Sequence, residues 1–294
     1  MSSALVGISP TPVEVPPVVH TLAGRLRSGA TVVPVWRNEY GGLTVRLEDR
    51  EAAPGPAPSS VSDPDSVATY LKWVPRAAAC PDPLAEADRL VWADSFAEVP
   101  RVLDVGSDTH GSWLLTEAIE VGGAVATSAV EPQWRALAAR SAIAVGVGLR
   151  RFHDVLPTDT CPFVRTAKMR VTALTTDPTA PLAAAERATI GATLGSPPPT
   201  DRLVVCHGDA TVPNTLLDQV GRFAAHVDVG DLGVADRWSD IAVTTRSVTR
   251  RYGPGLEPLV LAAYGITPDP ERTTNYRALW DAEEEVRTRR AASS

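Results

Sequence analysis

The chain has 294 residues, of which 44% are hydrophobic and 21% charged, and its formal net charge is −7 at pH 7. This composition is typical of a globular protein with one large domain or two lobes, and it excludes disordered and collagen-like chains. The acidic balance argues against a nucleic-acid partner, and no apolar run is long enough to cross a membrane. The N-terminus lacks a secretory signal pattern, and three distant cysteines fit neither a disulfide framework nor a zinc site, so we expect a cytoplasmic protein. We further expect a monomer or a weak dimer.

The first 118 residues predict a small antiparallel sheet with one helix. Alternating apolar residues over 31–47, on both sides of a turn at 38–42, predict a hairpin. A helix is expected over 82–93, with Asp82 as its N-cap. The prolines of residues 1–20 indicate a loose lead-in. The other elements expected here are a Pro/Ser-rich loop at 52–66 and strands at 67–74, 99–105 and 112–118.

From residue 119 onward the pattern becomes mainly helical. The expected helices are 132–149, 181–194, 239–251, 256–264 and 270–286, and the expected strands are 203–206, 215–218 and 223–229. The segments 158–162 and 175–178 are expected to be loops between helical segments. The fold class is therefore α+β, with a first lobe at 1–118 and a larger, mainly helical lobe at 119–294.

The strongest chemical signal is the run His207-Gly208-Asp209, followed by Asn214 and by Asp228. These side chains flank a short predicted hairpin, so they are expected to gather around one loop. An aspartate can orient a nucleophilic hydroxyl group, while an amide and a second carboxylate hold Mg²⁺ against nucleotide phosphates. The pattern therefore favours phosphoryl transfer.

The whole segment resembles the signature of the aminoglycoside phosphotransferases, particularly the branch that modifies a 3′-hydroxyl group. It reads HGDATVPNTLLDQVGRFAAHVDVGDLGVADRWSDIA. The resemblance implies a two-lobed protein-kinase-like fold and a kinase for a small hydroxylated amine, with ATP or GTP as co-substrate and Mg²⁺ as cofactor. Antibiotic resistance is the activity that such a kinase would confer.

Carried over by position, the resemblance gives five residues a role in catalysis or in binding the phosphates. Asp209 would orient the acceptor hydroxyl and take its proton, and Asn214 and Asp228 would ligate Mg²⁺. Lys72 would contact the α- and β-phosphates while Glu86 holds it in place; a surface ion pair is the alternative interpretation.

Further nucleotide contacts are expected from the first lobe. Asn38, Gly41 and Gly42 would form a loop over the phosphates, although an ordinary hairpin turn explains the same residues. Thr116 and Ala118 lie where the resemblance implies the strand leading to the adenine site.

The resemblance also implies residues that brace the loop and residues that bind the acceptor. His207 and Asp240 are expected to hold the catalytic loop in place, and Asp281 and Glu283 are the candidates for the acceptor's ammonium groups. The chain departs from the family pattern at Asp231, where many members carry an arginine.

Three other functions remain open at this stage, one of them a nucleotide-binding module that has lost its activity. Choline, fructosamine and homoserine kinases share the same core motif and would act on a non-drug acceptor. A metal-dependent hydrolase is also conceivable, with His207, Asp209, His226 and Asp228 as ligands, but it leaves Lys72 and Asn214 without roles.

Overall fold

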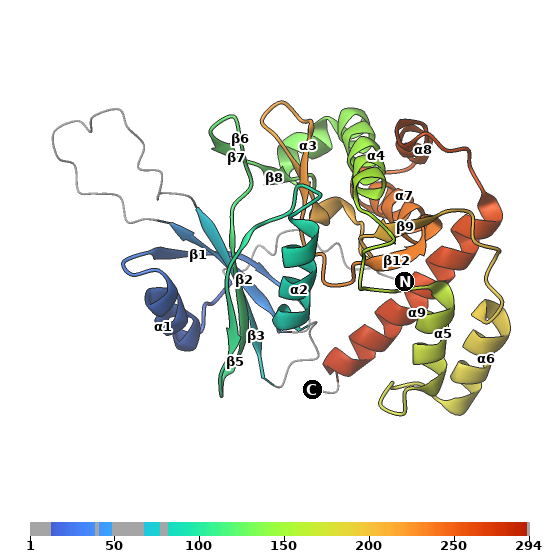
Figure 1. Cartoon of the computed structure of the whole chain (residues 1–294), viewed down its shortest axis with the longest axis horizontal. Helices are drawn as coiled ribbons and strands as arrows, with labels where there is room; N and C mark the ends of the chain where they lie inside the picture. The colour runs from blue at the N-terminus through green and yellow to red at the C-terminus, as the bar shows by residue number, and fades with distance from the viewer. Residues whose placement is uncertain (1–12, 39–40, 49–67, 77–81, 293–294) are drawn as a thin grey trace. The chain divides into compact units, whose positions relative to one another are not determined.

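The computed structural model describes residues 13–38, 41–48, 68–76 and 82–292 (Figure 1). The chain divides into two compact units: residues up to 84 with 102–118, and residues 85–101 with 119–293. The segment 85–101, which we expected in the first lobe, therefore belongs to the second unit. Helix α2 (Pro83–Ala93) contacts the rest of that unit through Arg89, whose Nε donates to the carbonyl oxygen of Leu232 at 3.1 Å.

The first unit is built on an antiparallel sheet. Its strand order is β1-β2-β3-β5-β4. The strands are β1 (Thr31–Arg37), β2 (Leu43–Glu48), β3 (Thr69–Pro75), β4 (Val102–Ser107) and β5 (Gly111–Glu117). Alternation in β2 buries Leu43, Val45 and Leu47 on one face, as expected from the side-chain period of two. The predicted loop at 52–66 lies outside the described residues.

A helix precedes the sheet where the sequence predicted a loose lead-in. α1 (Pro17–Leu26) begins with proline at its first turn, a position where the missing N–H costs no hydrogen bond. Its buried residues Val19, Leu22 and Ala23 join the sheet's apolar core. The expectation of a loose segment is therefore wrong for 17–20, because three apolar residues at helical spacing offset the proline signal; residues 1–12 lie outside the described part.

The second unit is mainly helical. Its larger helices are α3 (Pro132–Ala136), α4 (Ala138–Val155), α5 (Ala167–Thr176), α6 (Ala184–Leu194), α7 (Trp238–Tyr252), α8 (Glu257–Tyr264) and α9 (Pro270–Ala292). α4 packs on α8, and α9 packs on α5, α6 and α7 (Figure 1). The core between them includes Trp238, Ile241, Tyr264 and Leu279.

Helix α5 was not predicted from the sequence, and the loop expected at 175–178 begins inside its last turn, because α5 extends to Thr176. The Thr166 side chain caps this helix by accepting the Met169 N–H at 3.3 Å. The helix buries Arg170 among its apolar residues, so its sequence shows no clear apolar stripe. Pattern reading failed here because a charged residue occupies the buried face.

Short strands in the second unit frame the catalytic loop. β9 (Leu203–Cys206) pairs with β12 (Gly233–Asp236), and β10 (Thr215–Leu217) pairs with β11 (Phe223–His226) and with β8 (Thr127–Ser128). A small hairpin, β6 (Glu120–Val121) with β7 (Ala124–Val125), precedes them. The residues between β9 and β10 include a 3₁₀ turn, η1 (Val212–Asn214), and carry the motif.

Candidate active site

The catalytic loop leaves β9 through a turn that only glycine can make. Gly208 has a φ of 89°, and a Cβ placed on it would lie 2.2 Å from the carbonyl oxygen of Asp231. A side chain at this position would therefore be strained and would also collide with the backbone. The close approach fixes Asp209, the next residue, against the segment that follows Asp228.

A buried carboxylate on α7 holds the start of this loop. Asp240 is fully buried and accepts the backbone N–H groups of His207 at 2.6 Å and Gly208 at 3.0 Å. Burial alone would raise the pKa of Asp240, but the hydrogen bond and charge of His153, together with His207, hold that pKa below its usual value. The ionised carboxylate therefore accepts charge-assisted hydrogen bonds, which are roughly twice as strong as neutral ones.

The His207 side chain is committed to the backbone. Its Nδ1 accepts the N–H of Asp209 at 3.2 Å, so in the neutral ring Nε2 carries the proton and donates to the carbonyl oxygen of Val227 at 2.9 Å. Both ring nitrogens are used in this way. His207 thus connects the catalytic loop to the segment that carries Asp228, and neither nitrogen is available to a substrate or a metal.

Asp209 and Asn214 are joined directly. Asn214 Nδ2 donates to the backbone oxygen of Asp209 at 2.9 Å and to its Oδ2 at 3.0 Å. The remaining carboxylate oxygen, Asp209 Oδ1, is buried and has no hydrogen-bond partner among the described residues. A buried carboxylate oxygen without a partner is costly, so this atom is suited to accept a hydroxyl proton from outside the chain.

Asp228 lies beside this pair because of the hairpin register. Thr215 pairs with His226, and the Val227 N–H donates to the Asn214 carbonyl oxygen at 3.0 Å, so residues 214 and 228 flank the open end of the ladder. Asp228 has a φ of 64°, in the left-handed region. Burial and the negative charge of Asp228 raise the pKa of Asp209 to about 6.

These residues fit a divalent cation. The negative charge of Asp228 raises the proton affinity of Asp209, so a positive charge placed beside the two carboxylates would stabilise the ionised form of Asp209. Because Asn214 Nδ2 donates to Asp209, its Oδ1 is the atom that can ligate a metal, and the donor set of amide and carboxylate oxygens is the one that Mg²⁺ prefers.

The ligand set of the hydrolase alternative is not assembled. His207 uses both ring nitrogens on the backbone, and His226 lies in an aromatic cluster with Phe152 and Phe223. In the described part of the chain, one group of His, Cys, Asp or Glu residues is close enough to hold a metal: His153, Cys206 and Asp240. His153 there bonds Tyr264 and Asp240 through its two nitrogens, so this group is a structural network.

The predicted nucleotide-binding residues of the first unit lie on its sheet. Lys72 is in the central strand β3, in register with Thr44 on one side and Leu114 on the other. The Thr116 side chain is buried in β5, and the Ala118 N–H donates to the Ala68 carbonyl oxygen at 2.8 Å.

The expected phosphate loop is an ordered turn at its described residues. The Gly42 N–H donates to Asn38 Oδ1 at 2.7 Å, and Gly41 has a φ of 92°. Glu86, in the second unit, is buried with its side chain beside Gly230, so it lies close in space to the segment that carries Asp228. Its pairing with Lys72 stays a prediction.

The two carboxylates expected to bind the acceptor are both engaged by arginines. Glu283 accepts two hydrogen bonds from Arg170, at 2.9 and 2.7 Å, and also lies 3.4 Å from Arg165. Despite burial, which raises it, the pKa of Glu283 is lowered to about 2 by these cations. Asp281 is paired with Arg246. Glu283 is therefore a structural carboxylate in this conformation.

Two further groups lie near the site. His153 is buried; its Nε2 donates to Asp240 Oδ2 at 2.9 Å, and its Nδ1 lies 2.8 Å from the Tyr264 hydroxyl oxygen. A polar residue on the buried face of α4 is the sequence signal for this role. Arg287, on α9, lies 3.6 Å from Asp231 Oδ2, and no local pattern indicates that long-range contact.

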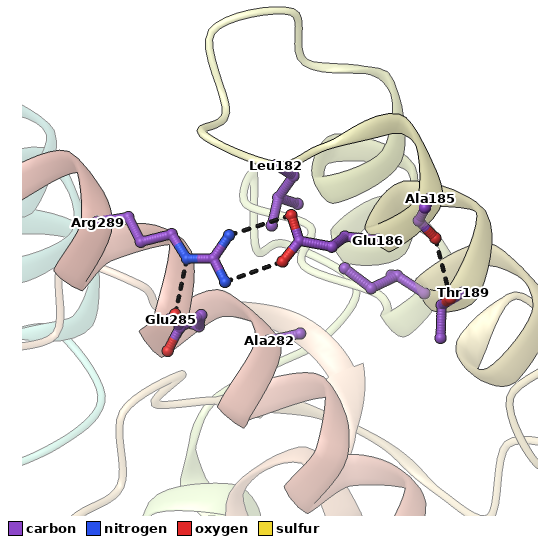
Figure 2. Close-up of a pocket in the computed structure, with 8 residues that line it drawn as sticks. Leu182, Ala185, Glu186, Thr189, Ala282, Glu285 and Arg289 are labelled. Atoms are coloured by element: carbon purple, nitrogen blue, oxygen red, sulfur yellow. Dashed lines mark hydrogen bonds and ion pairs between the residues drawn. The ribbon is translucent and has the colours of Figure 1, made fainter.

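A separate cavity lies between α6 and α9. Its volume is about 330 Å³, and Leu182 and Ile190 provide part of its apolar lining. Arg289 closes one side through Glu186 and Glu285 (Figure 2). The lining contains none of the predicted catalytic or metal-binding residues.

Comparison with known proteins places the chain among phosphotransferases. The model described as "Phosphotransferase enzyme family" matches residues 61–276. An aminoglycoside 3′-phosphotransferase of Streptomyces fradiae is 33% identical over 230 residues, covering 71% of this chain and 84% of the relative. A streptomycin 3″-kinase of Streptomyces griseus is 29% identical over 249 residues, covering 76% and 87%.

Solved structures agree with these relatives. A crystal structure of an aminoglycoside-3′-phosphotransferase of type VIII superimposes with a TM-score of 0.68 at 26% identity, covering 90% of this chain and 97% of the other. An aminoglycoside phosphotransferase of Streptomyces rimosus, in complex with ADP and streptomycin, gives a TM-score of 0.61 at 25% identity with the same coverage. The expected kinase-like fold, with an antiparallel sheet in one lobe and a helical second lobe, is thereby confirmed. No helix of the described residues is long and apolar enough to cross a membrane.

Proposed function

Because the chain belongs to the phosphotransferase enzyme family, we propose that it transfers the γ-phosphoryl group of ATP to the 3′-hydroxyl group of an aminoglycoside. Such an activity would confer resistance to the drug. The observation that carries the proposal is the buried, unpartnered Oδ1 of Asp209 beside Asn214 and Asp228. This arrangement supplies a proton acceptor and cation ligands at one place.

In the proposed reaction the acceptor oxygen attacks the γ-phosphorus while its O–H bond breaks and the proton passes to Asp209. The bond from the γ-phosphorus to the bridging oxygen breaks, and ADP leaves with that electron pair. When bound, Mg²⁺ would neutralise charge on the phosphates, and Asn214 Oδ1 and Asp228 would hold it. His207 and Asp240 keep Asp209 oriented through the backbone.

Nucleotide binding is part of the same proposal. Lys72, held by Glu86, would contact the α- and β-phosphates, the turn at Asn38, Gly41 and Gly42 would cover them, and Thr116 and Ala118 would lie near the base. The ADP complex of the Streptomyces rimosus relative supports an adenine nucleotide; GTP is the other candidate. An enzyme that consumes ATP would work in the cytoplasm. We further expect it to be a monomer or a weak dimer.

A non-drug acceptor is the second candidate, and one observation favours it. Glu283, which we expected to receive an ammonium group, is already occupied by two arginines. Asp281, about half exposed and paired with Arg246, is the acidic candidate that we retain. A choline-, fructosamine- or homoserine-type acceptor would need fewer free carboxylates than a polycationic drug.

The test is a phosphoryl-acceptor screen with the purified full chain. ADP release is measured with ATP or GTP against kanamycin, neomycin, streptomycin, choline, fructosamine and homoserine, and the phosphorylated hydroxyl is mapped on the product. Asp209→Asn keeps the shape but cannot accept a proton, so we expect its kcat to be at least about 100-fold lower. A wild-type protein that binds no Mg·ATP would overturn the proposal.

A further inference from the structure

Arg287 is an arginine whose usual helix partners are taken. On a helix, a carboxylate three or four residues earlier is the default partner of an arginine. For Arg287 these residues are Glu283 and Glu284. Glu283 is bonded by Arg170 and Arg165, and Glu284 lies 3.8 Å from Arg250. The Arg287 guanidinium makes no ion pair with either of them among the described residues and lies instead near Asp231.

The ion pair of Arg287 with Asp231 is loose. The guanidinium lies 3.6 Å from Asp231 Oδ2, beyond hydrogen-bonding distance, and the side chain is 28% exposed. Within the described ranges no hydrogen bond to this guanidinium is formed. Arg170, by contrast, makes three hydrogen bonds, to Glu283 and Ser239. Arg287 thus keeps a planar set of N–H donors that no acceptor in the described part of the chain fills.

This loose guanidinium is next to the catalytic loop. Its partner Asp231 lies in direct contact with Gly208, the residue before Asp209. Burial and the charge of Asp228 raise the pKa of Asp209, and Arg287 is among the groups whose charge opposes that rise. Through Asp231, a donor-rich cation therefore lies close to the loop that carries the proton acceptor.

We propose that Arg287 is a catalytic residue that binds oxygens of the phosphoryl group while it is transferred. The proposal rests on the proposed function. Charge in this transition state is spread over three equatorial oxygens, and a guanidinium matches two of them at once. Asp231, held on its other oxygen by Arg165 Nε at 3.2 Å, keeps Arg287 near the site without saturating its donors.

A simpler role for Arg287 would be to neutralise the charge of Asp231. Three variants distinguish this role from binding of the phosphoryl group. Arg287→Gln removes the charge, Asp231→Asn removes the carboxylate, and the double variant removes both. If Arg287 only neutralises Asp231, the double variant regains wild-type kcat. If it binds the phosphoryl group, the double variant stays as slow as Arg287→Gln. Arg289→Gln is the control, because Arg289 is on the same helix but pairs with Glu186 and Glu285 (Figure 2).

The second readout needs no acceptor. Affinities for ADP and for the non-hydrolysable β,γ-imido analogue of ATP, each with Mg²⁺, are measured by titration calorimetry. For Arg287→Gln we expect the analogue to bind about tenfold more weakly, ADP to bind unchanged, and kcat to fall at least about 100-fold. Wild-type values in Arg287→Gln, or recovery in the double variant, overturn the inference alone. A wild-type chain that binds neither nucleotide overturns the proposed function and this inference with it.

Discussion

Glu283→Gln should destabilise the protein strongly although the side chain lies on a helix near the surface. The carboxylate is 14% exposed, and it balances Arg170, which is 4% exposed, and Arg165. The Glu283 pKa of about 2, against an ordinary value of 4.5, corresponds to about 3 kcal/mol of folding free energy. Removing one partner of a buried ion pair typically costs about 3–5 kcal/mol, which agrees in scale. We expect a loss of about 3 kcal/mol at pH 7.

The loss should also depend on pH in a defined direction. Because the folded pKa of Glu283 is lowered, its contribution is complete above the unfolded pKa of about 4.5 and disappears as the pH falls through about 2. The gap between wild type and variant should therefore shrink to roughly 1.5 kcal/mol at pH 3. Urea unfolding at pH 7, 4 and 3 measures it, and Glu285→Gln, at an exposed position two residues on, should change little.

A gap below about 1 kcal/mol at pH 7, or one that stays constant down to pH 3, would refute the reasoning. The first result would mean that Arg165 and Arg170 find other partners when Glu283 is neutral. The second would mean that the cost comes from packing and not from charge.

Three further changes test the site and its surroundings. Gly208→Ala should lower kcat at least about tenfold, because the new methyl group meets the Asp231 backbone. Gly253→Ala is the control: Gly253 also has a positive φ (100°) but lies in open space, so kcat should be unchanged. Steady-state kinetics measures both. Asp240→Asn should lower the free energy of unfolding by about 2 kcal/mol and should lower kcat about tenfold or more. Its control, Asp218→Asn, weakens the turn between β10 and β11 and should reduce stability without changing kcat. Burial lowers the pKa of His226 to about 3, so its titration alone should cost about 2 kcal/mol of stability between pH 7 and pH 5, as the unfolded state takes up a proton. The stability of the wild type relative to His226→Phe should therefore fall by about 2 kcal/mol over this range, and parallel pH curves of the two proteins would contradict it.

The sequence predicted those elements whose burial follows a regular period. β2 and β3 alternate, and the helix at 83–93 begins next to Asp82, whose side chain accepts the Leu84 N–H at 3.0 Å as expected. α5 was missed because its buried face includes Arg170, whose partner Glu283 is 113 residues away. Local patterns cannot indicate a charge that becomes acceptable only through a distant ion pair.

The same limit explains why the catalytic residues were predicted from the sequence and the acceptor-binding residues were not. Asp209, Asn214 and Asp228 are close in sequence, and one hairpin brings them together, so spacing was sufficient to predict their proximity. The acceptor side depends on contacts between α9 and residues far from it in sequence. Asp281 and Glu283 looked like free acids on a helix, but each has an arginine partner that sequence order does not reveal.

The left-handed backbone of Asp228 limits which side chains can replace this proposed metal ligand. With a φ of 64°, the position favours glycine, asparagine and aspartate, and it disfavours longer or branched side chains. Glutamate, which also offers carboxylate oxygens, would have to strain the main chain first. Directed evolution of metal preference should therefore find its mutations around Asp228, and position 228 itself should stay aspartate or asparagine.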